Sequence, residues 1–298
     1  MSDALVGTLR ADVVASRPEY VVELAEAGEI GDAARPLSVW ERLYSHQAVR
    51  RITILVTFAL MWELAARWSD NPLIFPSFLQ TLAALWNGLI HGTLLDRIGT
   101  SLEVLAVGFS VALTVALVLT VFAVTTPFGA DVLNTLVSMF NPLPALAILP
   151  LALLWFGLGL EGLVLVMVQS VVWTVALNTF TGFQSVSETL RMAGQNFGMS
   201  HLGYIFRVLV PAAFPMIFSG LKIGWAHAWR TLIGAELVFG VASRSGGLGW
   251  YIYENQASFD TDNVFAGIMT IIIIGFLVEV LLFRTIEVRT IRRWGMAR

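Results

Sequence analysis

Cysteine is absent from this 298-residue chain, and lysine is reduced to Lys222 alone. The first absence excludes disulfide bonds, thiol nucleophiles and thiolate metal sites. Charged residues are scarce as well, at 13% of the chain against about 25% in a typical soluble domain. Hydrophobic residues make up 57%, and the mean hydropathy is +0.76. So much apolar surface needs a less polar solvent than water, and the chain is predicted to be an all-α integral membrane protein.

Motifs of soluble enzymes are also missing. The sequence contains no G-x-x-x-x-G-K-[ST] phosphate-binding loop and no H-E-x-x-H zinc motif. Its four histidines are scattered: His46, His91, His201 and His227. No catalytic residue and no metal ligand is therefore predicted. The function is expected to be transport, anchoring or an intramembrane site rather than enzymatic catalysis.

Long apolar runs set the predicted topology. A helix needs roughly 20 apolar residues to cross a bilayer. Six stretches qualify, at about 50–68, 100–125, 132–157, 161–182, 205–240 and 263–285. With the N-terminus inside, the outer segments hold only Arg67, Arg97 and Arg244, whereas most other arginines fall on the cytoplasmic side. The positive-inside rule therefore favours cytoplasmic termini, with residues 50–298 forming the transmembrane domain. Between the first two spans, a short helix is expected on the outer face.

Residues 1–49 form a predicted cytoplasmic extension. Residues 1–35 lack the apolar region of a signal peptide, and their acidic residues outnumber their arginines. Ser16, Pro18 and Glu19 are typical of a helix start, and the apolar residues in 21–25 favour a short amphipathic helix. Two interpretations stay open: a helix docked on the transmembrane domain, or a solvated extension.

A polar stretch from Gln184 to Pro211 interrupts the apolar pattern on the predicted cytoplasmic side. Ser187 suits the position before a helix. Apolar residues follow at helical spacing, namely Leu190, Met192, Ala193 and Phe197. Gly198 would end this helix or permit a bend. A helix–turn–helix that presents a surface to a partner is favoured over an ordinary loop.

At this point the sequence resembles the permease subunits of ABC importers. Their cytoplasmic loop reads E-A-A, then Gly three residues after the last Ala, then nine residues, then I-x-L-P. In this chain nine residues follow Gly198 and lead to Val208-Leu209-Val210-Pro211. Residues 212–215, Ala-Ala-Phe-Pro, continue the pattern.

Other segments are similar to one subfamily of these permeases. Residues 141–150 (NPLPALAILP) and 155–159 (WFGLG) look like its proline-rich third span. Shorter matches lie at 101–109, 235–236, 246–249 and 264–268. That subfamily imports nitrate, sulfonates, taurine, bicarbonate and related small molecules. The resemblance covers roughly residues 50–295.

The resemblance implies a type I importer permease with six transmembrane helices in the bacterial inner membrane. Two permease copies would form a pathway, with two ATP-binding subunits docked on the loop 184–207. An extracytoplasmic solute-binding protein would deliver a small anionic or zwitterionic solute. The chain itself would bind no cofactor and no nucleic acid, because ATP and Mg would be used by the partner ATPase.

The loop also supplies the residues predicted to couple to the ATPase. They are Glu188, Met192, Ala193, Gly194, Phe197, Gly198, Ser200, Arg207 and Pro211. The family's Glu aligns with Met192 and its second Ala with Gly194, so the usual carboxylate is missing. Our hypothesis is that Glu188, four residues before Met192, supplies the charge on the same helix face.

The predicted solute path consists of polar and proline residues within the spans. The candidates are Asn141, Pro142, Pro144, Trp155, Arg230 and Glu236. The prolines would interrupt the third helix and free carbonyl groups inside the bundle, and ionisable groups within spans are functional candidates. Arg230 and Glu236 lie six residues apart, off a common helix face, and bracing the bundle is their alternative role. Gln169, Thr174 and Asn178 are interpreted as contacts between helices.

Two other classes compete with the importer. A secondary transporter driven by an ion gradient predicts inverted repeats and intramembrane carboxylates, yet the chain shows no convincing repeat and few such carboxylates. A membrane-embedded enzyme or scaffold would need a clustered catalytic set, which the scattered acidic residues and histidines do not supply.

Overall fold

The computed structural model describes residues 45–197, 199–239 and 246–292, and every regular element in these ranges is a helix. The predicted all-α class is therefore confirmed for the described part of the chain. The chain divides into two compact units, Met1–Thr57 and Phe58–Arg298. The predicted helix near Ser16 and the glycine hinge at Gly198 lie outside the described residues.

Two of the four helices of the first half begin at side-chain caps. Helix α2 spans Gln47–Ser69, and α3 spans Phe78–Ile90, where the chain was predicted to form a short helix. Ser77 and Gln80 form a reciprocal capping box at the start of α3. Helix α4 spans Leu94–Thr125 and α5 spans Pro127–Phe140, the latter capped by Thr126, whose hydroxyl accepts from the Gly129 N–H.

The second half continues with helices throughout its described residues. Their bounds are η1 Ala145–Ile148, α6 Leu149–Phe156, α7 Leu160–Gln184, α8 Glu188–Asn196, α9 His201–Tyr204, η2 Ile205–Leu209, α10 Val210–Phe239 and α11 Leu248–Ala257. The C-terminal rod comprises α12 Thr261–Leu277, η3 Val278–Phe283, α13 Arg284–Glu287 and η4 Val288–Arg292. Asp260 caps α12 by accepting from the Asn263 N–H.

Four helical stretches in the described residues are long and apolar enough to cross a membrane: Leu94–Thr125, Leu160–Gln184, Ile205–Phe239 and Thr261–Ile291. They coincide with the second, fourth, fifth and sixth predicted spans. Helix α2 covers the predicted first span but is not one of the four. The described residues thus contain four candidate spans, or five if the broken pair is counted as one, and the six predicted spans stay a prediction.

That broken pair occupies the predicted third span, 132–157, where the prolines are expected to interrupt the helix. Helix α5 and the η1–α6 segment are bent by 85° at residues 141–144. Proline lacks an N–H and clashes with the preceding helical turn, so Pro142 and Pro144 stop α5. Pro150 lies in the first turn of α6, where a missing N–H leaves no bond unmade.

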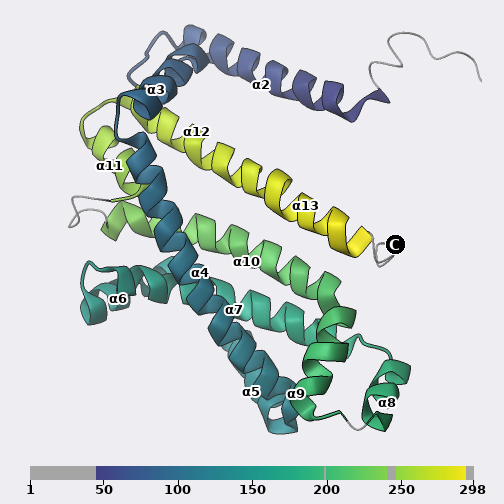
Figure 1. The fold of residues 1–298 in the computed structure, drawn as a ribbon. Coiled ribbons are helices and arrows are strands. Elements are labelled where there is room, and N and C mark those ends of the chain that lie inside the picture. The colour runs from purple at the N-terminus through teal and green to yellow at the C-terminus, as the bar shows by residue number, and fades with distance from the viewer. Residues whose placement is uncertain (1–44, 198, 240–245, 293–298) are drawn as a thin grey trace, which may run out of the picture. The chain divides into compact units, whose positions relative to one another are not determined.

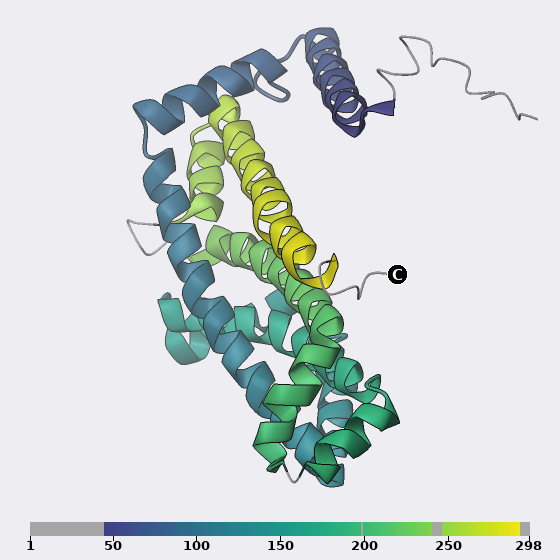
Figure 2. The ribbon, with the colours of Figure 1, turned by 45° about the vertical axis from the view of Figure 1, so that its right-hand side comes forward.

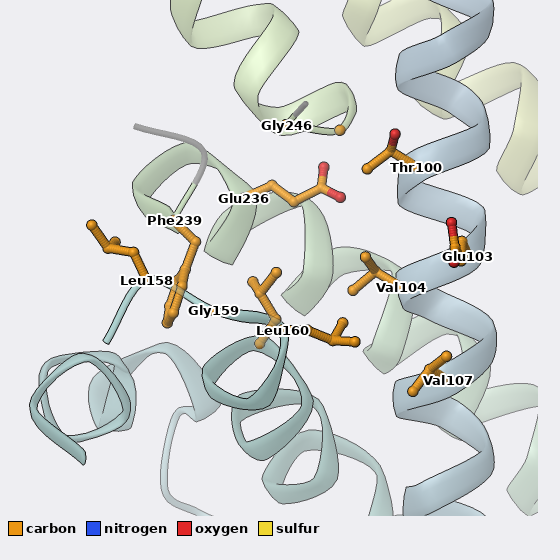
Figure 3. Close-up of a pocket in the computed structure, with 12 residues that line it drawn as sticks. Thr100, Glu103, Val104, Val107, Leu158, Gly159, Leu160, Glu236, Phe239 and Gly246 are labelled. Carbon is orange, nitrogen blue, oxygen red and sulfur yellow. The ribbon is translucent and has the colours of Figure 1, made fainter. Parts of the chain in front are cut away.

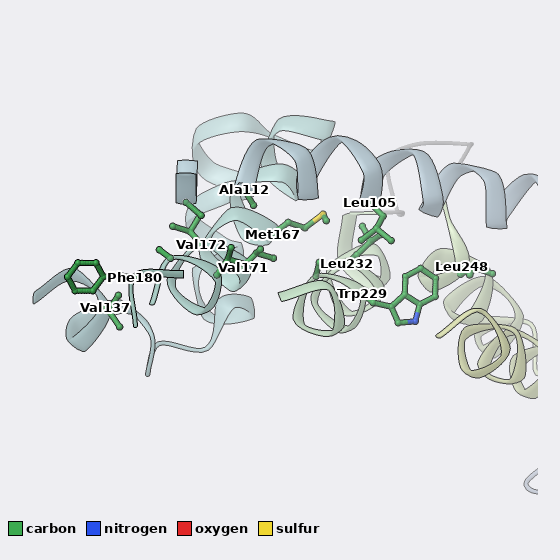
Figure 4. Close-up of a cluster of buried hydrophobic side chains, with 14 of the residues drawn as sticks. Leu105, Ala112, Val137, Met167, Val171, Val172, Phe180, Trp229, Leu232 and Leu248 are labelled. Atoms are coloured by element: carbon green, nitrogen blue, oxygen red, sulfur yellow. The ribbon is translucent and has the colours of Figure 1, made fainter. Parts of the chain in front are cut away.

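Helix α7 forms the centre of the bundle, packed along both α4 and α10 (Figures 1 and 2). Its buried residues Met167, Val171 and Val172 lie among core side chains of the two neighbours (Figure 4). Glycines allow the close approach, as in many membrane helix pairs. A Cβ at Gly224 of α10 would come within 2.6 Å of Val175 Cγ2, and one at Gly220 within 2.7 Å of Asn178 Cβ.

We predict that Gly224→Ala destabilises the protein by about 1–3 kcal/mol, because the added methyl group overpacks the contact between α10 and α7. The measurement is thermal unfolding of the purified chain in detergent. Gly99→Ala is the matched control, since Gly99 lies within α4 with no atom within 4 Å of an added Cβ. That control should gain about 0.5–1 kcal/mol from helix propensity. Equal effects of the two substitutions would contradict the packing argument.

Candidate functional site

Polar side chains connect α7 and α10 at two successive turns. The Thr231 hydroxyl donates to Ser170 Oγ at 2.9 Å, and Thr174 Oγ1 lies 3.5 Å from His227 Nδ1. The two contacts are four residues apart along each of the antiparallel helices, so they lie on one face of α7 and one face of α10. Thr174 thus contacts α10, and Asn178 donates to its own helix at the Thr174 carbonyl at 2.8 Å.

The break after α5 is supported by α7. Gln169 Nε2 donates to the Phe140 carbonyl at 2.9 Å, which satisfies a group at the end of α5. Trp173 Nε1 in turn donates to Gln169 Oε1 at 2.9 Å, and its ring stacks on Phe140 with centroids 5.2 Å apart. Irregular backbone is tolerated inside a membrane only where protein or water serves its polar groups. Gln169 therefore fixes the break in place.

A hollow of about 410 Å³ lies beside this break, and we name it the break hollow. Its lining comprises Asn141, Leu143, Pro144, Ala145, Leu146, Gln169, Ser170, His227, Arg230 and Thr231. The exposed side chain of Arg230 donates from Nε to its own helix, at the Ala226 carbonyl, at 3.1 Å. Three of the predicted solute-path residues, Asn141, Pro144 and Arg230, meet here.

The other predicted path residues lie elsewhere. Pro142 does not line the break hollow, and Trp155 is 64% exposed on α6. Sequence reasoning missed His227, Ser170 and Thr231 as lining residues. Helical spacing contained the signal for His227, which lies three residues before Arg230 on the same helix face.

Glu236 lies in a second hollow of about 290 Å³ between α4, the start of α7 and the end of α10, which we name the acidic hollow (Figure 3). The lining includes Glu103, which is exposed, and Glu236, which is only 3% exposed. The two Glu236 oxygens accept from Ser101 Oγ at 2.7 and 2.9 Å. Glu236 Oε2 also accepts from the Gly249 N–H at 2.8 Å.

The start of α11 closes over this carboxylate. Ser101 Oγ accepts from the Leu248 N–H at 2.8 Å, so Ser101 and Glu236 together accept hydrogen bonds from two N–H groups at the start of α11. Negative charge is favoured at a helix N-terminus. A side chain at Gly247 would overlap Ser101 and Glu236, and one at Gly249 would come within 2.5 Å of the Ile233 carbonyl. Three segments that carry the family resemblance, at 101–109, 235–236 and 246–249, therefore meet at one point.

Further contacts hold α11 in place. Arg97 donates to the Gly246 carbonyl at 2.8 Å and to Glu254 Oε2 at 3.1 Å. Tyr251 donates its hydroxyl proton to Asn263 Oδ1 at 2.9 Å. Burial raises the pKa of Tyr251 to about 12, so the phenol stays protonated and remains a donor at neutral pH.

The predicted coupling segment folds as two short helices, α8 and α9, around the undescribed Gly198. Helix α8 begins at Glu188, directly after Ser187. It carries Met192, Ala193 and Gly194, and it ends one residue before Phe197. Ser200 Oγ accepts from the Gly203 N–H at 3.2 Å at the start of α9. Pro211 is the second residue of α10 and follows the π-helical segment η2 directly, within the continuous helical stretch Ile205–Phe239.

Gly194 has a structural explanation in this segment. A Cβ there would come within 2.6 Å of the Tyr204 ring, so the family's usual Ala would push this ring away. Met192 and Phe197 are exposed, Phe197 by 79%, and Glu188 and Arg207 are exposed as well. The segment thus presents apolar and charged side chains outward.

Comparisons with known proteins identify similar sequences. The chain matches the sequence model of the family described as binding-protein-dependent transport system inner membrane component over residues 123–292. It is 30% identical to a taurine transport system permease protein of Escherichia coli over 246 residues, 80% of this chain and 88% of that protein. It is 27% identical to a nitrate import permease protein of Synechocystis over 247 residues, covering 80% and 87% of the two chains.

We predict that Glu236→Gln lowers the free energy of unfolding by about 1–3 kcal/mol, because an amide N–H₂ would replace one of the acceptors that face Ser101 and Gly249. Thermal unfolding in detergent measures the change. Glu103→Gln, an exposed carboxylate in the same hollow, should change stability by less than about 0.5 kcal/mol. If both variants unfold alike, Glu236 does not brace α11 in the way inferred.

Proposed function

The chain belongs to the family of binding-protein-dependent transport system inner membrane components, a family of multi-pass plasma-membrane permeases of ABC transporters. We propose that it is the membrane-spanning subunit of an ATP-driven, binding-protein-dependent importer of a small anionic or zwitterionic solute. The observation that carries this proposal is the 30% identity to a taurine permease protein across 80% of the chain. Its relatives named for taurine and for nitrate share an oxyanion as the common chemical feature of their solutes.

The proposed topology has six spans and both termini in the cytoplasm. Helix α2 would be the first span, and the bent pair of α5 with η1–α6 the third. The distribution of arginines supports this orientation, because with the N-terminus inside only Arg67, Arg97 and Arg244 lie in outer segments. The α8–α9 segment then lies on the cytoplasmic side, and α3 with α11 on the outer side.

In this arrangement α8 and α9 form the proposed docking surface for the ATPase. Its exposed Met192 and Phe197 offer apolar contact area, and Glu188 offers a charge one helical turn from Met192. Two ATP-binding subunits, a second permease copy and an extracytoplasmic binding protein would complete the importer. ATP and Mg would be bound by the ATPase, whose closure would move α8 and α9 and switch the path between its two openings.

The carboxylate in the fifth span supports an importer over an ion-gradient carrier. Carriers of that kind place carboxylates where ions or protons come and go. Glu236 instead accepts hydrogen bonds from Ser101 and Gly249 in a buried position. These contacts fit a structural brace better than a site that must exchange its ligand.

Transport in vesicles tests the proposed function. The chain, co-expressed with its partner subunits, is reconstituted in proteoliposomes with the binding protein outside, and uptake of labelled taurine and nitrate is measured. We expect uptake that requires internal ATP and is abolished by vanadate. Uptake that persists without ATP and collapses with an ionophore would instead identify an ion-gradient-driven transporter.

We predict that Glu188→Gln lowers retention of the ATPase subunit on the purified permease on the order of tenfold, because a charge-assisted contact is lost. Retention is measured by quantifying both subunits after washing in detergent. Glu161→Gln is the control, since Glu161 is an exposed carboxylate at the far end of α7 from α8. Unchanged retention with Glu188→Gln would refute the role of Glu188.

A further inference from the structure

We infer that the break hollow is a binding station for a small oxyanion, held by the guanidinium of Arg230. Its place along the solute path rests on the proposed function, but its preference for anions follows from its own residues. Three features support this site: the ion pairs that other cations form and Arg230 does not, the residues that line the hollow, and the planar shape of the guanidinium.

Arg230 differs from two other cationic side chains of these helices, Arg97 and Lys222. Arg97 pairs with Glu254 at 3.1 Å, and Lys222 of the same α10 helix forms an ion pair with Glu279. Among the described residues, no carboxylate lies within ion-pair distance of Arg230. Its Nε donates a hydrogen bond to the Ala226 carbonyl of its own helix. A cation within a membrane span is costly unless it faces an anion, water or a partner. The positive charge of Arg230 is thus left for a ligand.

The lining of the break hollow adds neutral donors and no acidic group. Asn141 contributes an amide, and His227 contributes an imidazole whose Nδ1 lies 3.5 Å from Thr174 Oγ1. The Ser170–Thr231 pair shares one hydrogen bond between two hydroxyls, so one hydroxyl proton remains to donate. The acidic hollow has the opposite character, since Glu103 and Glu236 line it and none of its described lining residues is a cation. The two hollows therefore favour opposite charges.

The guanidinium also selects among anions. Its planar fork of N–H groups matches two oxygens of a sulfonate, nitrate or carboxylate, which a halide cannot offer. The volume of about 410 Å³ exceeds that of a small oxyanion and leaves room for several waters. Binding in such an open, wet hollow is weak enough for the ion to leave, as a path requires.

The absence of cysteine makes a direct test possible in the full-length chain. Leu143→Cys places one thiol at the exposed lining of the break hollow, and Val107→Cys places one in the acidic hollow. Membrane vesicles containing either variant are treated with two methanethiosulfonates, one bearing an ethylsulfonate and one a trimethylammonium. The ratio of the two modification rates reports the local charge, and the sulfonate reagent is itself a probe of the proposed ligand class.

We expect the sulfonate reagent to be favoured in the Leu143→Cys variant, and the preference to fall roughly tenfold when Arg230→Gln is added, because a unit charge acts on both reagents in opposite directions. Methanesulfonate or nitrate should slow modification of this variant more than chloride does at equal ionic strength. Arg230→Lys should keep the rate preference but lose much of this protection. In the Val107→Cys variant the cationic reagent should be favoured, with no effect of Arg230→Gln.

Equal rates of the two reagents in the Leu143→Cys variant, an unchanged ratio after Arg230→Gln, or no reaction with either reagent would overturn the inference. No partner subunit and no ATP enter this experiment. A failed uptake experiment therefore leaves the anion station standing, whereas symmetrical reactivity would remove the station and leave the proposed importer intact.

Discussion

The contact between α7 and α10 is the constraint on which the rest of the bundle depends. Gly220 and Gly224 bring the two backbones close, and this closeness allows the short side chains of Ser170 and Thr231 to meet at 2.9 Å. Lipid tails give apolar helices little reason to associate, so close packing and interhelical hydrogen bonds must hold the pair. With α7 fixed, Gln169 can reach the end of α5, and the break hollow forms beside it.

Arg230 and Glu236, both in the last third of α10, meet the same physical problem in two different ways. Polar groups within a membrane need partners from the protein. Near the end of the helix, Glu236 finds them in Ser101 and in the start of α11, and the carboxylate becomes a brace. Two turns earlier, Arg230 has no carboxylate partner among the described residues, and the surrounding donors are neutral. The hydrogen-bonded carboxylate of Glu236 and the guanidinium of Arg230, which has no carboxylate partner among the described residues, thus have different roles on one helix.

Local patterns in the sequence predicted the parts of this fold that depend on local chemistry. The apolar runs located α4, α7, α10 and α12, and Pro142 with Pro144 predicted the interrupted third helix. The sequence could not show that Ser101 would donate a hydrogen bond to Glu236, because 135 residues separate the two and neither is unusual within a helix. Nor could it explain Gly194, whose reason is the Tyr204 ring that packs against it. The count of six spans stays a prediction, because helix length and apolar content alone do not decide the role of α2.

A cryo-electron microscopy map of the chain, purified in mild detergent with whatever subunits accompany it, tests the central claim most directly. The account predicts two permease copies with their break hollows, including Arg230, facing a shared aqueous path, and an ATP-binding subunit seated against α8 and α9 of each. A map in which the break hollow faces lipid, or in which α8 and α9 contact no ATP-binding subunit, would contradict it.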